Sequence, residues 1–340
     1  HPGVLIKDEL EATPNLNQRI LAKELDVKPS FLNEIIKGKR PVTADIAILL
    51  EKTLGISADY WMKFQSQYEI DKARLKEKNI KKLKNIELWN IIKEYVPVLY
   101  FKKHNYLQND IESDIKAIKN IYDITTIDEL VSSFSKEKFA YYRKSDKLKI
   151  DNKNMFAWSA LAQYEAKNQK TNTFNFDNIN QLCVNLNNIF YENSRTPEHV
   201  KSILNQFGIK MLLINKLEKA PIDGFSFWSG KNPAIALTLR YNRIDNFAFT
   251  IMHEIGHIDL HLRNDRERKF MDLTKKQNLD QFENEADNYA QEKLIPKRIW
   301  QDILNNYLPL NDDKIIALAN KHKINPAILL GRICYEMDYY

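Results

Sequence analysis

The stretch FTIMHEIGHIDLHL, Phe249–Leu262, places three histidines at intervals of four residues and a glutamate beside the first. Residues four apart on an α-helix lie on one face, about 6 Å apart along the axis. His253 and His257 can therefore direct ring nitrogens at one metal ion, and Glu254 lies where a base can take a proton from metal-bound water. The alternative is an amphipathic helix whose histidines are merely exposed.

A zinc site of this kind needs a third protein ligand and an open position for water. His261 follows His253 by eight residues, about 12 Å along the axis, so we expect a neighbour of the site and not a ligand. The segment FENEADNYAQEKLIP supplies Glu283 as the preferred ligand and Glu285 as the second choice. Asp287, one turn after Glu283, is expected to hold a ligand histidine through its other ring nitrogen.

Together with the upstream IDGFSFWSGKNPAIALTL, these motifs resemble the ImmA/IrrE family of metallopeptidases. The resemblance implies that His253, His257 and Glu283 bind Zn2+ and that Glu254 is the catalytic base. It also implies a sheet whose edge strand holds an extended substrate, and members of the family are implicated in cutting helix-turn-helix repressors. Asp287 stands where many members have Asn, and either residue can fill the structural role.

Near the N-terminus, NQRILAKELDV and KPSFLNEIIKG predict two short helices joined by a tight turn. In a helix-turn-helix the second helix presents its polar face to the major groove. Asn33 can pair with an adenine edge and Lys37 with guanine or phosphate, while Gln18 is placed for a phosphate contact. The alternative is a helical bundle used only for dimerisation. The residues expected to contact DNA are Gln18, Lys28, Ser30, Asn33, Lys37, Lys39 and Arg40.

This N-terminal region, above all GKRPVTADIAILLEKTLG and SADYWMKFQ, resembles the HigA-type antitoxins of the XRE helix-turn-helix class. The resemblance implies a homodimer that represses its own operon by binding double-stranded operator DNA; many members also neutralise an RNase toxin. Two positions depart from the family pattern. Asp26 occupies a turn position often held by Gly, and Lys28 replaces the usual Ser or Thr cap.

The composition fits a soluble, largely helical protein, with 44% hydrophobic and 28% charged residues and only 8 glycines in 340 residues. The net charge of +6 gives weak support for nucleic-acid binding. Cys183 and Cys334 lie far apart, so any metal site must be built from His and carboxylates. No apolar run approaches the roughly 18 residues of a membrane span, and no signal-peptide pattern is present; we expect a cytoplasmic protein.

We expect a mainly α protein in three parts. Residues 1–76 form a lambda-repressor-like helix-turn-helix bundle and residues 77–175 a helical connector. Residues 176–340 form an α+β, zincin-like metallopeptidase domain. Its small sheet is expected from IKMLLI, GFSFWS and AIALTL, with mostly helical sequence after the histidine helix.

These features predict a DNA-binding regulator that carries a zinc-dependent endopeptidase domain. Its substrate would be a regulatory protein, such as a repressor or a toxin, or the chain itself. The alternative is a non-catalytic antitoxin, or a repressor whose zincin domain only senses a metal or a peptide. Glu254 favours the enzyme, because a protein that only binds a ligand has no need of a base at this position.

Overall fold

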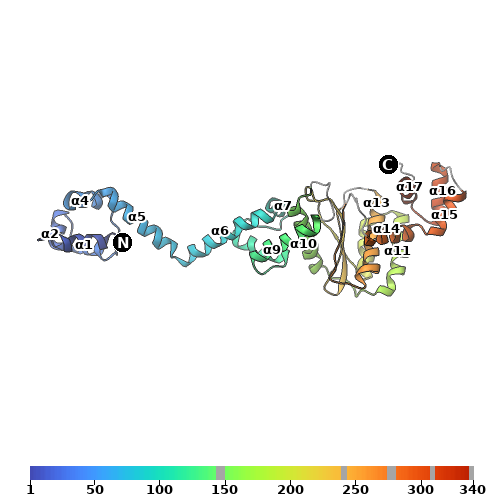
Figure 1. Cartoon of the computed structure of the whole chain (residues 1–340), viewed down its shortest axis with the longest axis horizontal. Coiled ribbons are helices and arrows are strands. Elements are labelled where there is room, and N and C mark those ends of the chain that lie inside the picture. Colours follow the sequence, from blue (N-terminus) through green and yellow to red (C-terminus); the bar gives the residue numbers. More distant parts are fainter. Residues whose placement is uncertain (143–149, 239–242, 274–280, 307–310, 337–340) are drawn as a thin grey trace. The chain divides into compact units, whose positions relative to one another are not determined.

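The structure is a computed structural model that describes residues 1–142, 150–238, 243–273, 281–306 and 311–336. The chain divides into two compact units, His1–Glu87 and Leu88–Tyr340 (Figure 1). The boundary lies within helix α6 (Glu77–Tyr95). The expected division into three parts, at residues 76 and 175, stays a prediction.

The first unit is a bundle of short helices around one apolar core. Before α6 its helices are α1 (Gly3–Ala12), α2 (Gln18–Glu24), α3 (Pro29–Ile36), α4 (Ala44–Leu54) and α5 (Ala58–Arg74). Leu32 and Trp61 are fully buried in this core. The side-chain oxygens of Thr43 and Ser57 accept backbone N–H groups at the starts of α4 and α5, as expected from good capping residues.

Val4 and Ile20 stand at helical spacing with other apolar residues, and from the sequence we expect both in this core; both lie on the surface instead. Val4 is 57% exposed and Ile20 is 40% exposed, whereas Ile6 is fully buried. For Val4 the reason is the way α1 meets α3. The Ile35 carbonyl lies so close to Gly3 that a Cβ there would overlap it, so α1 turns its Gly3–Ile6 side inward.

The turn between α2 and α3 is tight. Asp26 has φ 49°, in the left-handed region that glycine adopts most readily, which accounts for the glycine often found at this position. Val27 N–H donates to the Ala22 carbonyl at 2.9 Å. The Gln18 side-chain amide donates to the Pro29 carbonyl at 3.3 Å and links the two helices. The expected helix-turn-helix pair is confirmed.

The second unit contains a four-stranded mixed sheet in the order β1-β3-β2-β4. Its strands are β1 (Lys210–Leu213), β2 (Ile222–Ser229), β3 (Asn232–Leu237) and β4 (Phe270–Leu273). β1 and β3 are parallel, and β2 is antiparallel to both β3 and β4. The first three strands match the expected runs. The expectation of mostly helical sequence after the histidine helix missed β4, whose short apolar run is interrupted by Asp272 and which pairs with β2.

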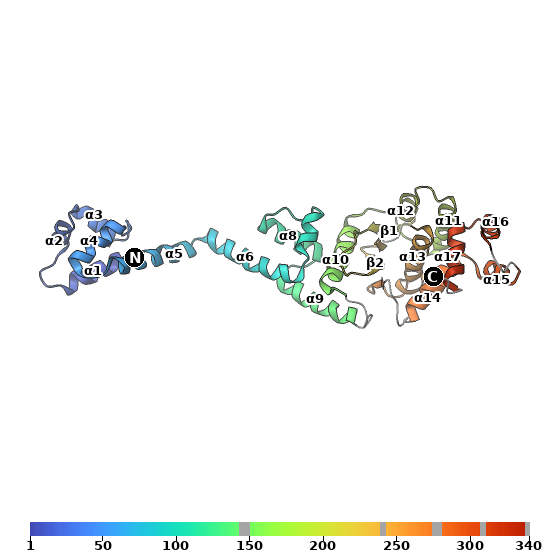
Figure 2. The same ribbon diagram turned by 90° about the horizontal axis from the view of Figure 1, so that it is seen from above.

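Helices cover both faces of this sheet (Figures 1 and 2). On one face the cluster of buried side chains draws on the C-terminal half of α6, α7 (Val98–Lys103), α8 (Ile111–Tyr122), α9 (Ile127–Tyr142) and α10 (Asn152–Asn168). On the other lie a 3-10 turn (Phe176–Asn178), α11 (Ile179–Glu192), α12 (Thr196–Gln206), α13 (Ile244–Gly256), α14 (Gln281–Leu294), α15 (Lys297–Asn306), α16 (Asp312–His322) and α17 (Pro326–Glu336). No helix in the described ranges has the length and apolar character needed to cross a bilayer.

Alternation along the strands divides the sheet between two cores. Ala234 packs in the core on the α10 side and its neighbour Ile235 in the core on the α13 side. On β2, Phe225 faces α10. Gly224 and Ser226 therefore face α13, the helix that carries the HEIGH motif.

Candidate metal centre

The histidine helix is buried. α13 runs directly into a six-residue π-helical segment, His257–Leu262, and the two together carry the motif. His253, Glu254 and His257 are all completely inaccessible to solvent. The interpretation of FTIMHEIGHIDLHL as a surface helix with exposed histidines is therefore wrong. Buried charged and polar groups of this kind are usually paired or bind metals.

Three side chains that can bind a metal ion, His253, His257 and Glu283, converge beside α13. The Nε2 atoms of His253 and His257 lie 3.0 Å apart. Glu283 Oε2 lies 3.4 Å from His253 Nε2, and Glu283 Oε1 lies 3.8 Å from His257 Nε2. One ligand atom from each of the three residues falls within 4.8 Å of the others, so this group can hold a metal ion. Two imidazole nitrogens and one carboxylate are a set that divalent transition metals favour.

α14 brings Glu283 to the histidines because it packs closely against α13. At Gly256 a Cβ would lie 3.2 Å from the Cα of Ala286, a contact so tight that α14 would have to shift slightly to admit it. One turn after Glu283, the Asp287 carboxylate lies 2.8 Å from His253 Nδ1. Helix α14 thus supplies one candidate metal ligand, Glu283, and also the carboxylate of Asp287, which orients a second candidate ligand, His253.

His261 and Glu285, considered as ligands from the sequence, contact each other instead. His261 Nε2 lies 3.0 Å from Glu285 Oε2. His261 Nδ1 lies 3.0 Å from His257 Nδ1, on the side of that ring away from His253. Neither residue belongs to the group of converging donors among the described residues.

The Glu254 carboxylate lies between α13 and β2. The Ser226 hydroxyl donates to Glu254 Oε2 and approaches the Glu254 backbone carbonyl at 3.1 Å. On the other side, a Cβ at Gly224 would overlap Glu254 Oε1. Asp272 of β4 completes the surroundings, with a ligand atom within 4.8 Å of those of His253 and Glu254.

Burial and neighbouring charges shift both ionisable groups of the HE pair. Burial raises the pKa of Glu254 to about 8, opposed by His253 and reinforced by Asp272. Burial alone would lower the pKa of His253, but the Asp287 and Glu283 carboxylates raise it to about 10. The metal-free site therefore holds protons at neutral pH that a bound cation would displace.

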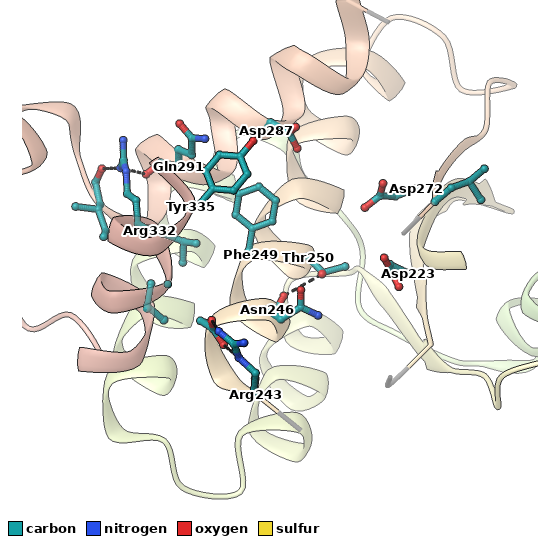
Figure 3. A pocket seen from close by; sticks show the side chains of 16 residues that line it. Asp223, Arg243, Asn246, Phe249, Thr250, Asp272, Asp287, Gln291, Arg332 and Tyr335 are labelled. Atoms are coloured by element: carbon teal, nitrogen blue, oxygen red, sulfur yellow. Dashed lines mark hydrogen bonds and ion pairs between the residues drawn. The ribbon is translucent and has the colours of Figure 1, made fainter. Parts of the chain in front are cut away.

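A pocket of about 670 Å³ adjoins the centre (Figure 3). Asp287 lines this pocket and also contacts His253, so the pocket reaches the donor group. Figure 3 shows Asp223 and Asp272 on the sheet side, across from the α13 side chains. Other labelled residues in the lining are Arg243, Asn246, Phe249, Thr250, Gln291, Arg332 and Tyr335.

Comparison with known proteins finds a family match within each unit. Residues 6–61 match the family profile described as helix-turn-helix. Virulence-associated protein I of Dichelobacter nodosus is 35% identical over 80 residues, which are 24% of this chain and 74% of that protein. The chain belongs to the helix-turn-helix family. Its residues 204–333 match the profile of the IrrE N-terminal-like domain, in peptidase family M78.

Further similarities fall in the helix-turn-helix domain. The uncharacterized HTH-type transcriptional regulator YddM of Escherichia coli K12 is 28% identical over 72 residues, 21% of this chain and 76% of that protein. An addiction module antidote protein of the HigA family from Coxiella burnetii is 32% identical, covers 25% of this chain and 89% of its own, and has a TM-score of 0.23. Pseudomonas aeruginosa antitoxin HigA, solved with the higBA promoter, is 32% identical over 24% of this chain and 88% of that chain, with a TM-score of 0.23.

In the helix-turn-helix domain, the polar residues singled out from the sequence lie on α3, in the turns beside it and at the start of α2. Lys28, Ser30, Lys37, Lys39 and Arg40 are exposed, and Gln18 and Asn33 are half-buried. The Arg40 guanidinium is bonded to Glu34 and lies 5.2 Å from the centre of the Phe31 ring. The role of these residues in binding DNA stays a prediction.

In the IrrE N-terminal-like domain, sequence reasoning missed two side chains beside the HE pair. Ser226 and Asp272 lie on strands far from the motif in the chain, and only the sheet brings them to Glu254. The contact between His261 and Glu285 was missed as well. A signal existed for Ser226, because on β2 it alternates with two phenylalanines and so had to face the opposite side of the sheet.

Proposed function

We propose that this chain is a DNA-binding transcription regulator whose IrrE N-terminal-like domain is a zinc-dependent endopeptidase. The observation that carries the proposal is the convergence of His253, His257 and Glu283 beside the buried carboxylate of Glu254. The substrate would be a peptide bond in a regulatory protein, such as a repressor or toxin, or in the chain itself. Such a regulator would act in the cytoplasm as a homodimer.

The residues of the centre fit Zn2+. His253 and His257 would bind it through Nε2 and Glu283 through its carboxylate, a set of three protein ligands typical of catalytic zinc. When bound, zinc lowers the pKa of a water molecule to about 7 and polarises a substrate carbonyl. Asp287 keeps the proton of His253 on Nδ1, so that Nε2 stays free to bind.

Glu254 is the proposed general base. In the metal-free site burial raises the pKa of this carboxyl to about 8, and a cation bound beside it would lower that pKa, which leaves a carboxylate that can accept a proton and return it. The Ser226 hydroxyl donates a hydrogen bond to the Glu254 carboxylate and fixes its orientation. Glu254 would take a proton from water and later deliver it to the leaving amine. The adjoining pocket would receive a side chain of the substrate.

For the DNA-binding role, α3 would enter the major groove of operator DNA. Asn33 would contact a base edge, and Lys37 a guanine or a phosphate. Gln18, Lys28, Ser30, Lys39 and Arg40 would contact the backbone or flanking groups. The similarity to a protein named as an HTH-type transcriptional regulator supports this part of the proposal.

The decisive variant is Glu254→Gln, which keeps the size of the side chain and removes the base. We expect unchanged zinc content by elemental analysis, unchanged DNA binding, and loss of cleavage of candidate repressors, toxins or the chain itself, followed by mass spectrometry. Glu292→Gln, an exposed change on α14, is the matched control. Equal cleavage by Glu254→Gln and wild type would remove Glu254 as the base. Zinc-loaded wild type that binds these proteins and cuts none would favour the non-catalytic sensor.

A further inference from the structure

A chain of hydrogen bonds leads from His257 to the protein surface. His257 Nδ1 lies 3.0 Å from His261 Nδ1, and His261 Nε2 lies 3.0 Å from Glu285 Oε2. We propose that His261 and Glu285 are positioning residues that fix the ring and the tautomer of His257 for metal binding. This inference rests on the proposed metal centre, and it assigns a role to the two residues that are not ligands.

The direction of each hydrogen bond follows from the position of His257. Its Nε2 faces the donor group, 3.0 Å from His253 Nε2, so the ring must keep its proton on Nδ1 to bind a metal. That N–H donates to His261 Nδ1. With Nδ1 accepting, His261 carries its own proton on Nε2 and donates it to the Glu285 carboxylate.

Aromatic side chains hold both rings in this geometry. The His257 ring stacks on Phe270 of β4, with centroids 4.4 Å apart and planes at 16°. His261 lies 5.1 Å from the Phe270 ring and meets the edge of Phe282 at 5.0 Å and 89°. These contacts stabilise the ring orientations in which the hydrogen bonds form.

The two metal-binding histidines are thus oriented by different means. His253 reaches the Asp287 carboxylate directly, at 2.8 Å. His257 reaches a carboxylate through a second imidazole. Gln281 donates to the other oxygen of Glu285 at 2.7 Å and fixes the end of the chain. A carboxylate that accepts from a ligand histidine makes that ligand more basic. The relay through His261 would act on His257 in the same direction.

The test is the Zn2+ affinity of the full chain, measured by competition with a chromophoric chelator. Glu285→Ala should bind Zn2+ about 10- to 100-fold more weakly than wild type. Glu285→Gln, whose carbonyl can still accept from His261, should fall between the two. The control is Glu292→Ala on the same helix, which loses a charge and a hydrogen bond from Lys297 N–H but touches no histidine; it should match wild type.

Nitrogen-15 NMR of the histidine side chains reports the tautomer directly, which a purely structural role of Glu285 would leave unchanged. In the zinc-loaded protein His261 should be the neutral Nε2–H tautomer, and Glu285→Ala should shift that signal while Glu292→Ala does not. Glu283→Ala separates this inference from the proposed centre, because it removes a ligand. If Glu283→Ala binds Zn2+ as tightly as wild type, the centre itself is wrong. If Glu283→Ala loses Zn2+ and Glu285→Ala keeps the wild-type affinity, only the positioning role is overturned.

Discussion

The Nδ1 atom of His253 lies 2.8 Å from an oxygen of Asp287, while Nε2 of the same ring lies 3.4 Å from Glu283. Both carboxylates come from α14 and are one turn apart, so one helix holds both nitrogens of the imidazole. The ring can approach α14 this closely because Gly256 lets the helices meet. Orientation of the ligand is therefore built into the packing of two helices.

Asp287 should tolerate one substitution and not another. Asp287→Asn keeps an oxygen that can accept from His253 Nδ1–H, so zinc affinity should fall only severalfold. Asp287→Ala removes the acceptor and should weaken zinc binding by about 10- to 100-fold. Chelator competition on both variants measures the difference. Equal affinities for the two variants would contradict a role in orienting His253.

Gly224→Ala should disturb Glu254 without touching the metal ligands. The added Cβ would overlap Glu254 Oε1, and such overpacking typically costs about 1–3 kcal/mol of unfolding free energy. We expect lower stability in chemical denaturation and weaker cleavage, with zinc still bound. A double-mutant cycle gives the control: in a Glu254→Ala background the overlap is gone, so Gly224→Ala should cost less. An equal cost in both backgrounds would place the strain elsewhere.

Metal-free protein should lose stability as the pH rises. The folded state raises the pKa of Glu254 from 4.5 to about 8 and that of His253 from 6.5 to about 10. The native state then binds more protons than the unfolded state within these ranges, and the unfolding free energy falls with increasing pH. For Glu254 the stabilisation is present below pH 4.5 and is lost as the pH rises through about 8; for His253 it is present below 6.5 and is lost through about 10.

Zinc binding should show the opposite trend, because the cation displaces these protons. Affinity should increase about tenfold per pH unit for each proton released. Calorimetry between pH 6 and 8 in buffers of different ionisation enthalpy counts the protons. A binding constant that does not change over this range would contradict the protonation of the metal-free centre.

The local pattern of the sequence predicted the parts of the site that lie within one helix. The i, i+4 spacing places His253 and His257 together, and the same spacing relates Glu283 to Asp287. Rejecting His261 as a ligand needed only the rise of a helix. The sheet was visible as three apolar runs, whereas β4 was not, since Asp272 interrupts its four residues and the charged Lys269 precedes them.

The remaining features depend on how elements pack. Ser226 reaches Glu254 because β2 lies under α13, and no spacing within the chain encodes that distance. His261 and Glu285 were weighed singly as ligands, and their contact exists only because α14 lies beside the π-helical segment. Val4 and Ile20 were misplaced for a similar reason: in short helices with several apolar residues, the partner helix decides which face is inside.

The outer face of α3 gives the prediction for the first unit. Asn33→Ala together with Lys37→Ala should lower operator affinity by roughly tenfold or more, since a good base contact contributes about 1–3 kcal/mol of discrimination. Neither side chain belongs to the apolar core, so the thermal unfolding of the domain should not change. The control is Lys63→Ala, an exposed change on α5, which also removes one positive charge but no predicted DNA contact. A gel-shift titration at two salt concentrations compares them: the double variant should also show a salt dependence weaker by about one unit of slope if Lys37 contacts phosphate. Operator binding by the double variant equal to that of Lys63→Ala would mean that another face of the domain meets DNA.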